Sequence, residues 1–179
     1  MRRGILLLVV TSLNVPIPGQ VRHRAWELRS LLIDFDQLRD EFTLVIKRLP
    51  NNEHETIGPI RERTRSALRG VAPFEVKIDG IGSFEQPVTE PAPVVYFTVT
   101  SPGLERLHER LVEEFEAIPG LEGDDYVPHI TLARGGEIRA QQLADLCNHE
   151  IEPLTWSVER LVFWDNSQQL PMGDIRLPA

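Results

Sequence analysis

The segment His129-Ile130-Thr131-Leu132 holds two side chains that can act on a phosphate. It lies in a predicted strand over about 127–134, where side chains alternate, so His129 and Thr131 share one face. An imidazole transfers protons near neutral pH, and a hydroxyl can hydrogen-bond a phosphate oxygen. The pair is half of a phosphoryl-transfer site if its face is open, although a lone histidine in a strand is more often structural.

The elements around this motif alternate between strands and helices. Apolar runs and alternation predict strands over 4–10, 42–49, 74–78, 94–99, 127–134 and 154–164, with a glycine turn at 80–82. Helical spacing predicts helices over 21–32, 57–68, 102–117 and 139–147. Each half therefore has the order strand, helix, strand, helix, strand. This order predicts an α+β fold of two similar lobes, with antiparallel sheets, outer helices and an approximate internal twofold.

Composition narrows the class of protein. The 179 residues, 41% hydrophobic and 26% charged, are typical of one globular domain over 1–179. A net charge of -8 argues against gripping long nucleic acid but allows a small or terminal phosphate in a local pocket. A single cysteine, Cys147, excludes an internal disulfide. We expect a cytoplasmic protein with no membrane partner, and we interpret the apolar run at 4–10 as a buried strand rather than a secretion signal.

The wider sequence around His129 resembles a known family. Tyr126-Val127-Pro128-His129-Ile130-Thr131-Leu132-Ala133-Arg134 is similar to the second His-x-Thr-x motif of the two-histidine phosphoesterase superfamily, which includes RNA 2',3'-cyclic phosphodiesterases, or 2'-5' RNA ligases. The similarity covers nearly the whole chain, including segment 74–84 and the closing strand, which ends with Val162-Phe163-Trp164. It implies an active-site cleft between the lobes and metal-independent action on 2',3'-cyclic phosphates or 2'-5' linkages. The implied partners are RNA 3' ends or small nucleotide phosphates.

The first motif of that family is altered. Its pattern falls on Glu41-Phe42-Thr43-Leu44, where Thr43 matches and Glu41 occupies the histidine position. In this interpretation Thr43 and Thr131 bind the phosphate, Glu41 serves as general base and His129 as acid, because a carboxylate of ordinary pKa, about 4.3, is a poor acid at neutral pH. Regular alternation adds Lys47 to the same face as a phosphate ligand. The alternatives are a solvated Glu41 at the strand entrance and a surface Lys47.

Other candidate residues carry less specific signals. Tyr126 can stack on a base or cap the cleft, and core packing is equally compatible with it. Regular alternation places Arg134 on the face opposite His129, and the flanking charges predict surface positions for His23, His108 and His149. No metal-ligand spacing and no glycine-rich nucleotide loop occurs in the sequence, so we expect neither a metal nor a cofactor.

Two classes of function follow from the altered motif. One is a metal-independent phosphodiesterase in which His129 and Glu41 exchange protons. The other is a non-catalytic binder of cyclic or terminal nucleotide phosphates that has lost turnover with the first histidine.

Overall fold

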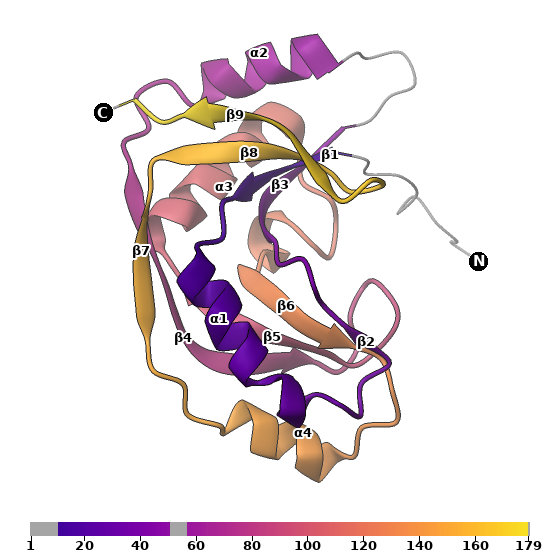
Figure 1. Cartoon of the computed structure of the whole chain (residues 1–179). Helices are drawn as coiled ribbons and strands as arrows, with labels where there is room; N and C mark the ends of the chain where they lie inside the picture. The colour runs from indigo at the N-terminus through magenta and orange to yellow at the C-terminus, as the bar shows by residue number, and fades with distance from the viewer. Residues whose placement is uncertain (1–10, 51–56, 179) are drawn as a thin grey trace, which may run out of the picture.

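Two antiparallel sheets form the two lobes of the computed structural model, which describes residues 11–50 and 57–178 (Figure 1). Within these residues one sheet has the order β3-β1-β8-β9, formed by Leu44–Leu49, Thr11–Val15, Arg160–Asp165 and Leu170–Arg176. The other has the order β2-β6-β5-β4-β7, formed by Gln37–Leu38, His129–Arg134, Val94–Thr100, Phe74–Phe84 and Leu154–Val158. The predicted α+β class with antiparallel sheets in two lobes is confirmed.

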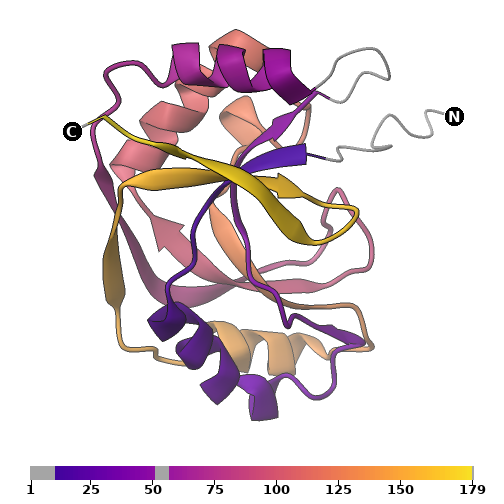
Figure 2. The same cartoon turned by 45° about the horizontal axis from the view of Figure 1, so that its top comes forward.

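Helices cover the outer sides of both sheets. They are α1 (Gly19–Glu27), α2 (Ile57–Ala67), α3 (Pro102–Phe115) and α4 (Ala140–Cys147), with short 3-10 turns η1 (Arg29–Leu31) and η2 (Gly123–Asp125). In both views α2 and α3 lie at one end of the molecule and α1 and α4 at the other (Figures 1 and 2). No helix in the described part of the chain is long and apolar enough to cross a membrane.

An internal repeat relates the two lobes. The order β1-α1-β3-α2-β4 in the first half matches β5-α3-β6-α4-β8 in the second. The last strand of each half crosses to the other lobe, because β4 pairs with β5 and β8 pairs with β1. The strands β3, which begins at the last residue of the first predicted motif, and β6, which holds the second, thus occupy corresponding positions in the repeat.

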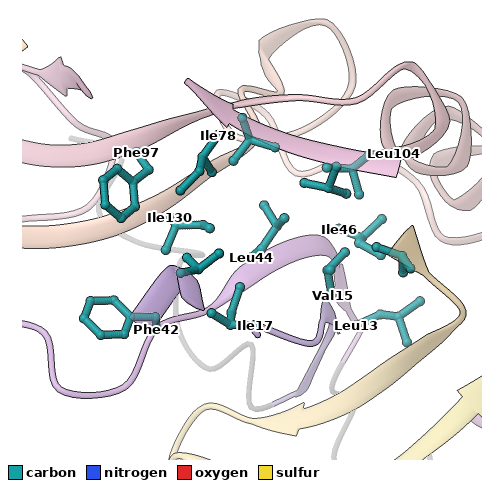
Figure 3. Close-up of a cluster of buried hydrophobic side chains, with 14 of the residues drawn as sticks. Leu13, Val15, Ile17, Phe42, Leu44, Ile46, Ile78, Phe97, Leu104 and Ile130 are labelled. Atoms are coloured by element: carbon teal, nitrogen blue, oxygen red, sulfur yellow. The ribbon is translucent and has the colours of Figure 1, made fainter. Parts of the chain in front are cut away.

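The apolar residues of the motif strands point into the core between the lobes. Leu44, Ile46 and Ile130 are fully buried and lie among Val15, Phe97 and other side chains from both sheets (Figure 3). Burying a residue of this size stabilises the fold by about 1.5–3 kcal/mol. Their strand neighbours on the other face remain open to the cleft.

Several predicted boundaries differ from the structure. The strand predicted at 4–10 lies outside the described residues. The first helix ends at Glu27 instead of residue 32, and the 3-10 turn η1 follows it at Arg29–Leu31. The glycine turn predicted at 80–82 is wrong, because β4 runs through these glycines with one register shift. The single strand predicted over 154–164 is two strands that separate at Glu159 and enter different sheets. The short β2 and the final β9 were not predicted.

Candidate active site

One cleft of about 380 Å³ lies between the lobes and is lined by residues of both motif strands. Glu41, Thr43, His129 and Thr131 all line it, as the resemblance implied. Glu41 is exposed just before β3, whereas Thr43, His129 and Thr131 are half-buried. Further lining residues come from both lobes: Ser12, Arg39, Val45, Arg48, Phe84, Val88, Leu121, Tyr126, Arg134 and Trp164.

His129 is held in one orientation by its own loop and by two aromatic rings. Its Nδ1 lies 2.7 Å from the carbonyl oxygen of Val127. Because a carbonyl only accepts, Nδ1 must carry the proton, and Nε2 is the nitrogen left for a ligand. The rings of Phe84 and Tyr96 each lie 5.1 Å from the imidazole, centre to centre. The histidine therefore has a fixed tautomer and a fixed ring plane.

Glycine in β4 makes the aromatic support of His129 possible. A Cβ at Gly82 would lie 2.7 Å from the ring of Tyr96, which is too close for any larger residue without displacing the ring. The ring instead packs over the strand and contacts Phe84, with ring centres 4.4 Å apart. Gly82, in the segment predicted as a turn, serves here to admit the aromatic residue beside His129.

Burial lowers the pKa of His129 to about 4. Desolvation of the imidazolium is the largest cause, the Val127 carbonyl opposes it, and the positive charges of Arg48 and Arg134 add to the lowering. At neutral pH the imidazole is therefore uncharged and can accept a proton at Nε2. A bound phosphate would bring negative charge close to the ring and raise this pKa.

A β-bulge in each motif strand changes which side chains reach the cleft. On β3, Leu13 pairs with Lys47 and Asn14 with Val45, so Ile46 is an extra residue. On β6, Val95 pairs with Ala133 and Tyr96 with Thr131, so Leu132 is extra. A bulge interrupts the alternation of side chains. Beyond each bulge, the opposite set of residues faces the cleft.

The prediction that Lys47 faces the cleft is wrong because of the bulge at Ile46. Lys47 is 1% exposed and does not line the cleft; its Nζ lies 2.5 Å from Glu122 and donates to the carbonyl of Arg48 at 2.7 Å. The next residue, Arg48, lines the cleft in its place. In a regular strand Lys47 would line the cleft. The extra residue exchanges the faces on which Lys47 and Arg48 lie.

The bulge at Leu132 likewise places Arg134 on the same side as His129, contrary to the prediction. Arg134 lines the cleft and donates through Nη1 to the carbonyl and hydroxyl oxygens of Thr89 at 3.2 Å. Burial lowers the pKa of its guanidinium, and the charges of Arg39 and Arg48 lower it further. Three arginines thus gather in the cleft of a protein whose net charge is -8.

His108 was predicted at the surface and is instead 1% exposed. Its Nε2 accepts from the backbone N–H of Gly123 at 2.9 Å, so Nδ1 donates to the carbonyl of Ile46 at 2.6 Å. Burial lowers the pKa of this imidazole, which stays neutral. Glu105 and Glu109 flank His108 on its helix and suggested exposure, but the side chain faces β3 instead. Its hydrogen bond to the carbonyl of Ile46 supports the extra residue of the bulge.

Tyr126 joins the loop before β6 to the first motif strand. Its hydroxyl donates to the carbonyl of Val45 at 2.7 Å, and its ring stacks on His108 with centres 3.7 Å apart. Burial raises the pKa of the phenol. Although Tyr126 lines the cleft, one ring face and the hydroxyl are already engaged in holding the two motif strands together.

The paired bulges also give a residue-by-residue correspondence between the lobes. Counted from them, Thr43 corresponds to His129, Val45 to Thr131 and Arg48 to Arg134. The residues 43–48 and 129–134 share one order of exposure: half-buried, buried, half-buried, buried, buried, half-buried. The motif pattern in the sequence instead matched Glu41 with His129, two residues earlier. In either register, His129 is the single imidazole among the described residues that line the cleft.

Sequence reasoning missed several residues that the fold brings to the site. Three of them line the cleft, namely Arg39, Arg48 and Phe84, and a fourth, Tyr96, contacts His129 from the adjacent strand. Phe84 is the last residue of the 74–84 segment, which carried part of the family resemblance. Its place in that segment was the only indication of a role at the site. Arg39 and Arg48 gave none, because arginine is abundant throughout the chain. Among the described residues, no three His, Cys, Asp or Glu side chains form a group suited to a metal.

A neutral imidazole, two threonines and three arginines around one cleft between repeated lobes define a site of the phosphoesterase type. The family model of the 2'-5' RNA ligase superfamily matches residues 43–169, and the chain belongs to this superfamily. The match begins at Thr43 and leaves Glu41 just outside. Membership supports a phosphodiesterase-type function.

Solved structures share this fold at low sequence identity. The crystal structure of TT0787 of Thermus thermophilus matches with a TM-score of 0.65 and 22% identity, over 93% of this chain and 97% of that one. Escherichia coli LigT in its apo form matches with a TM-score of 0.66 and 17% identity, over 94% and 97%. LigT complexed with 3'-AMP matches with a TM-score of 0.63 and 16% identity, over 94% and 98%. No curated protein sequence matches the chain.

Proposed function

We propose that this protein is a metal-independent phosphodiesterase that opens 2',3'-cyclic phosphates, or cleaves 2'-5' linkages, at RNA 3' ends or in small nucleotides. The observation that carries the proposal is the neutral imidazole of His129, held beside Thr131 in a cleft with arginines. Structures of E. coli LigT complexed with 3'-AMP and with phosphate support a nucleotide phosphate as ligand for this fold.

In this mechanism His129 removes a proton from water through Nε2 while the water oxygen attacks phosphorus. The sequence predicted the reverse assignment, with Glu41 as base and His129 as acid. A histidine whose pKa is held near 4 carries little proton to donate at neutral pH, so the role of base suits it better. Glu41, exposed at the cleft mouth, stays an alternative base, and Thr43 and Thr131 are the proposed phosphate ligands.

The direct test is hydrolysis in the presence of a chelator. Purified protein with adenosine 2',3'-cyclic phosphate, and with a short RNA ending in a 2',3'-cyclic phosphate, is expected to yield a single phosphomonoester isomer, resolved by chromatography. One isomer is expected because water activated by a fixed base attacks phosphorus in line with only one of the two ribose oxygens. A mixture of isomers, or a rate no higher than buffer alone, would contradict the proposal.

Thr131→Val tests the phosphate contact without changing the shape of the side chain. The valine cannot donate to a phosphate oxygen, and losing one hydrogen bond to a charged group costs about 1.5–3 kcal/mol. We expect affinity for 3'-AMP, measured by calorimetry, to fall by about 10- to 150-fold. Thr155→Val, at an exposed position of the edge strand β7, is the matched control. Unchanged binding in Thr131→Val would place the ligand elsewhere.

The second candidate is a binder without turnover, and one observation favours it. Within residues 11–50 and 57–178, His129 is the single imidazole lining the cleft, whereas the superfamily pattern supplies two. A protein that binds 3'-AMP through Thr131 but hydrolyses none of these substrates, with Thr43→His equally inert, belongs to this class.

A further inference from the structure

Arg48 reaches the cleft because a bulge and a buried ion pair position this part of β3. The bulge at Ile46 turns Lys47 into the protein and Arg48 out of it. The carboxylate of Glu122, 3% exposed, accepts from Lys47 Nζ and from the backbone N–H groups of Arg48 and Ile118, at 2.5, 2.8 and 3.0 Å. A buried ion pair thus holds the backbone of Arg48 directly.

The guanidinium of Arg48 is only loosely paired with the same carboxylate. Its Nη1 lies 3.9 Å from Glu122, beyond hydrogen-bonding distance, whereas closer donors occupy both carboxylate oxygens. Burial lowers the pKa of this guanidinium, and the charge of Glu122 opposes the lowering. The N–H groups of Arg48 therefore face a cleft in which an anion would relieve their desolvation.

Arg48 also has a counterpart across the cleft. It corresponds to Arg134 under the internal repeat, since each arginine stands two residues after its bulge. Arg48 belongs to the four-stranded lobe and His129 to the five-stranded lobe, and the charge of Arg48 acts on both His129 and Arg134. Arg48 and Arg134 belong to different lobes, and both place positive charge near the imidazole of His129. Such an arrangement suits an anion held between the two arginines.

We propose that Arg48 is a catalytic residue that donates hydrogen bonds to the phosphate and to the departing ribose oxygen, in place of the acid that the altered first motif lacks. This inference rests on the proposed function. His129 takes the proton of water, the water oxygen bonds to phosphorus, and the bond from phosphorus to the ribose oxygen breaks. The released oxygen keeps the electron pair and takes a proton from solvent, and His129 returns its proton to solvent. Arg48 stays protonated throughout.

The test compares substrates with poor and good leaving groups. In Arg48→Gln, kcat for adenosine 2',3'-cyclic phosphate is expected to fall by about 10- to 150-fold, the range for losing a charge-assisted hydrogen bond. For bis(4-nitrophenyl) phosphate the fall is expected to be only a few-fold, because nitrophenolate leaves without such help. Arg48→Lys keeps the charge and should lie between. Arg160→Gln, at an exposed ion pair with Asp174, is the control.

A merely structural role predicts a different pattern, because a distorted cleft slows both substrates equally. Equal loss on the two substrates, or no loss on either, overturns the proposal for Arg48. Binding of inorganic phosphate, followed by calorimetry, separates this result from failure of the proposed function. If wild type hydrolyses nothing, the proposed function fails, and phosphate binding unchanged in Arg48→Gln then removes Arg48 from the anion site as well.

Discussion

His129→Asn is expected to lower kcat for 2',3'-cyclic phosphate hydrolysis by about 10²- to 10⁴-fold, the usual contribution of one positioned proton-transfer group. Asparagine can still donate to the Val127 carbonyl that now holds Nδ1, so the loop should keep its conformation while the base at Nε2 is lost. Initial rates with adenosine 2',3'-cyclic phosphate give the comparison. His23→Asn, on an exposed helix face, is the control.

The pH dependence of the wild-type enzyme is expected to report the same group. Protonation abolishes a base, so kcat/KM should stay level from neutral pH downward and fall only as pH approaches the His129 pKa of about 4. The bound phosphate raises this pKa, so the fall in kcat should begin at a higher pH than the fall in kcat/KM. An acid limb in kcat/KM near the ordinary histidine pKa would contradict the lowered pKa of His129, and an acid limb that persists in His129→Asn would assign the base to another residue.

Thr43→His is expected to raise kcat by about 10²-fold or more, because it supplies a second proton-transfer group opposite His129. The paired bulges make Thr43, and not Glu41, the counterpart of His129. The new imidazole would lie at a half-buried position just before β3, where it can protonate the departing oxygen. The same cyclic phosphate assay measures the gain.

Glu41→His is the matched comparison, since it restores the histidine at the position the motif pattern indicates. At the exposed entrance of β3 an imidazole lies farther along the strand from the bulge, and we expect a change of only a few-fold. A large gain from Glu41→His with none from Thr43→His would show that the motif register is right and the bulge register wrong.

The two motif strands show what local pattern establishes in this protein. Alternation of apolar and polar residues predicted β3 and β6, and it correctly separated the core residues Leu44 and Ile130 from Thr43 and Thr131, which line the cleft. The helices α2, α3 and α4 were also predicted within a few residues. Such features depend on neighbours in sequence, because burying one face of a strand or helix requires a fixed period along the chain.

The cations of the site depend on contacts that no local pattern contains. Arg48 and Arg134 face the cleft only because Ile46 and Leu132 are extra residues against β1 and β5. Lys47 is buried because Glu122, 75 positions later in the chain, accepts a hydrogen bond from its ammonium group. A one-residue change of register exchanges the two faces of a strand, so a sequence read as regular alternation assigns the wrong cation.

The sequence by itself predicted the motif strands, the two-lobed repeat and a candidate site that includes His129 and Thr131, both of which line the cleft. The tertiary structure decided which arginines join them, which histidine is buried as support and where β7 ends and β8 begins. The physical reason is that periodicity depends on the covalent chain, whereas bulges, buried ion pairs and strand exchange between sheets depend on partners distant in sequence.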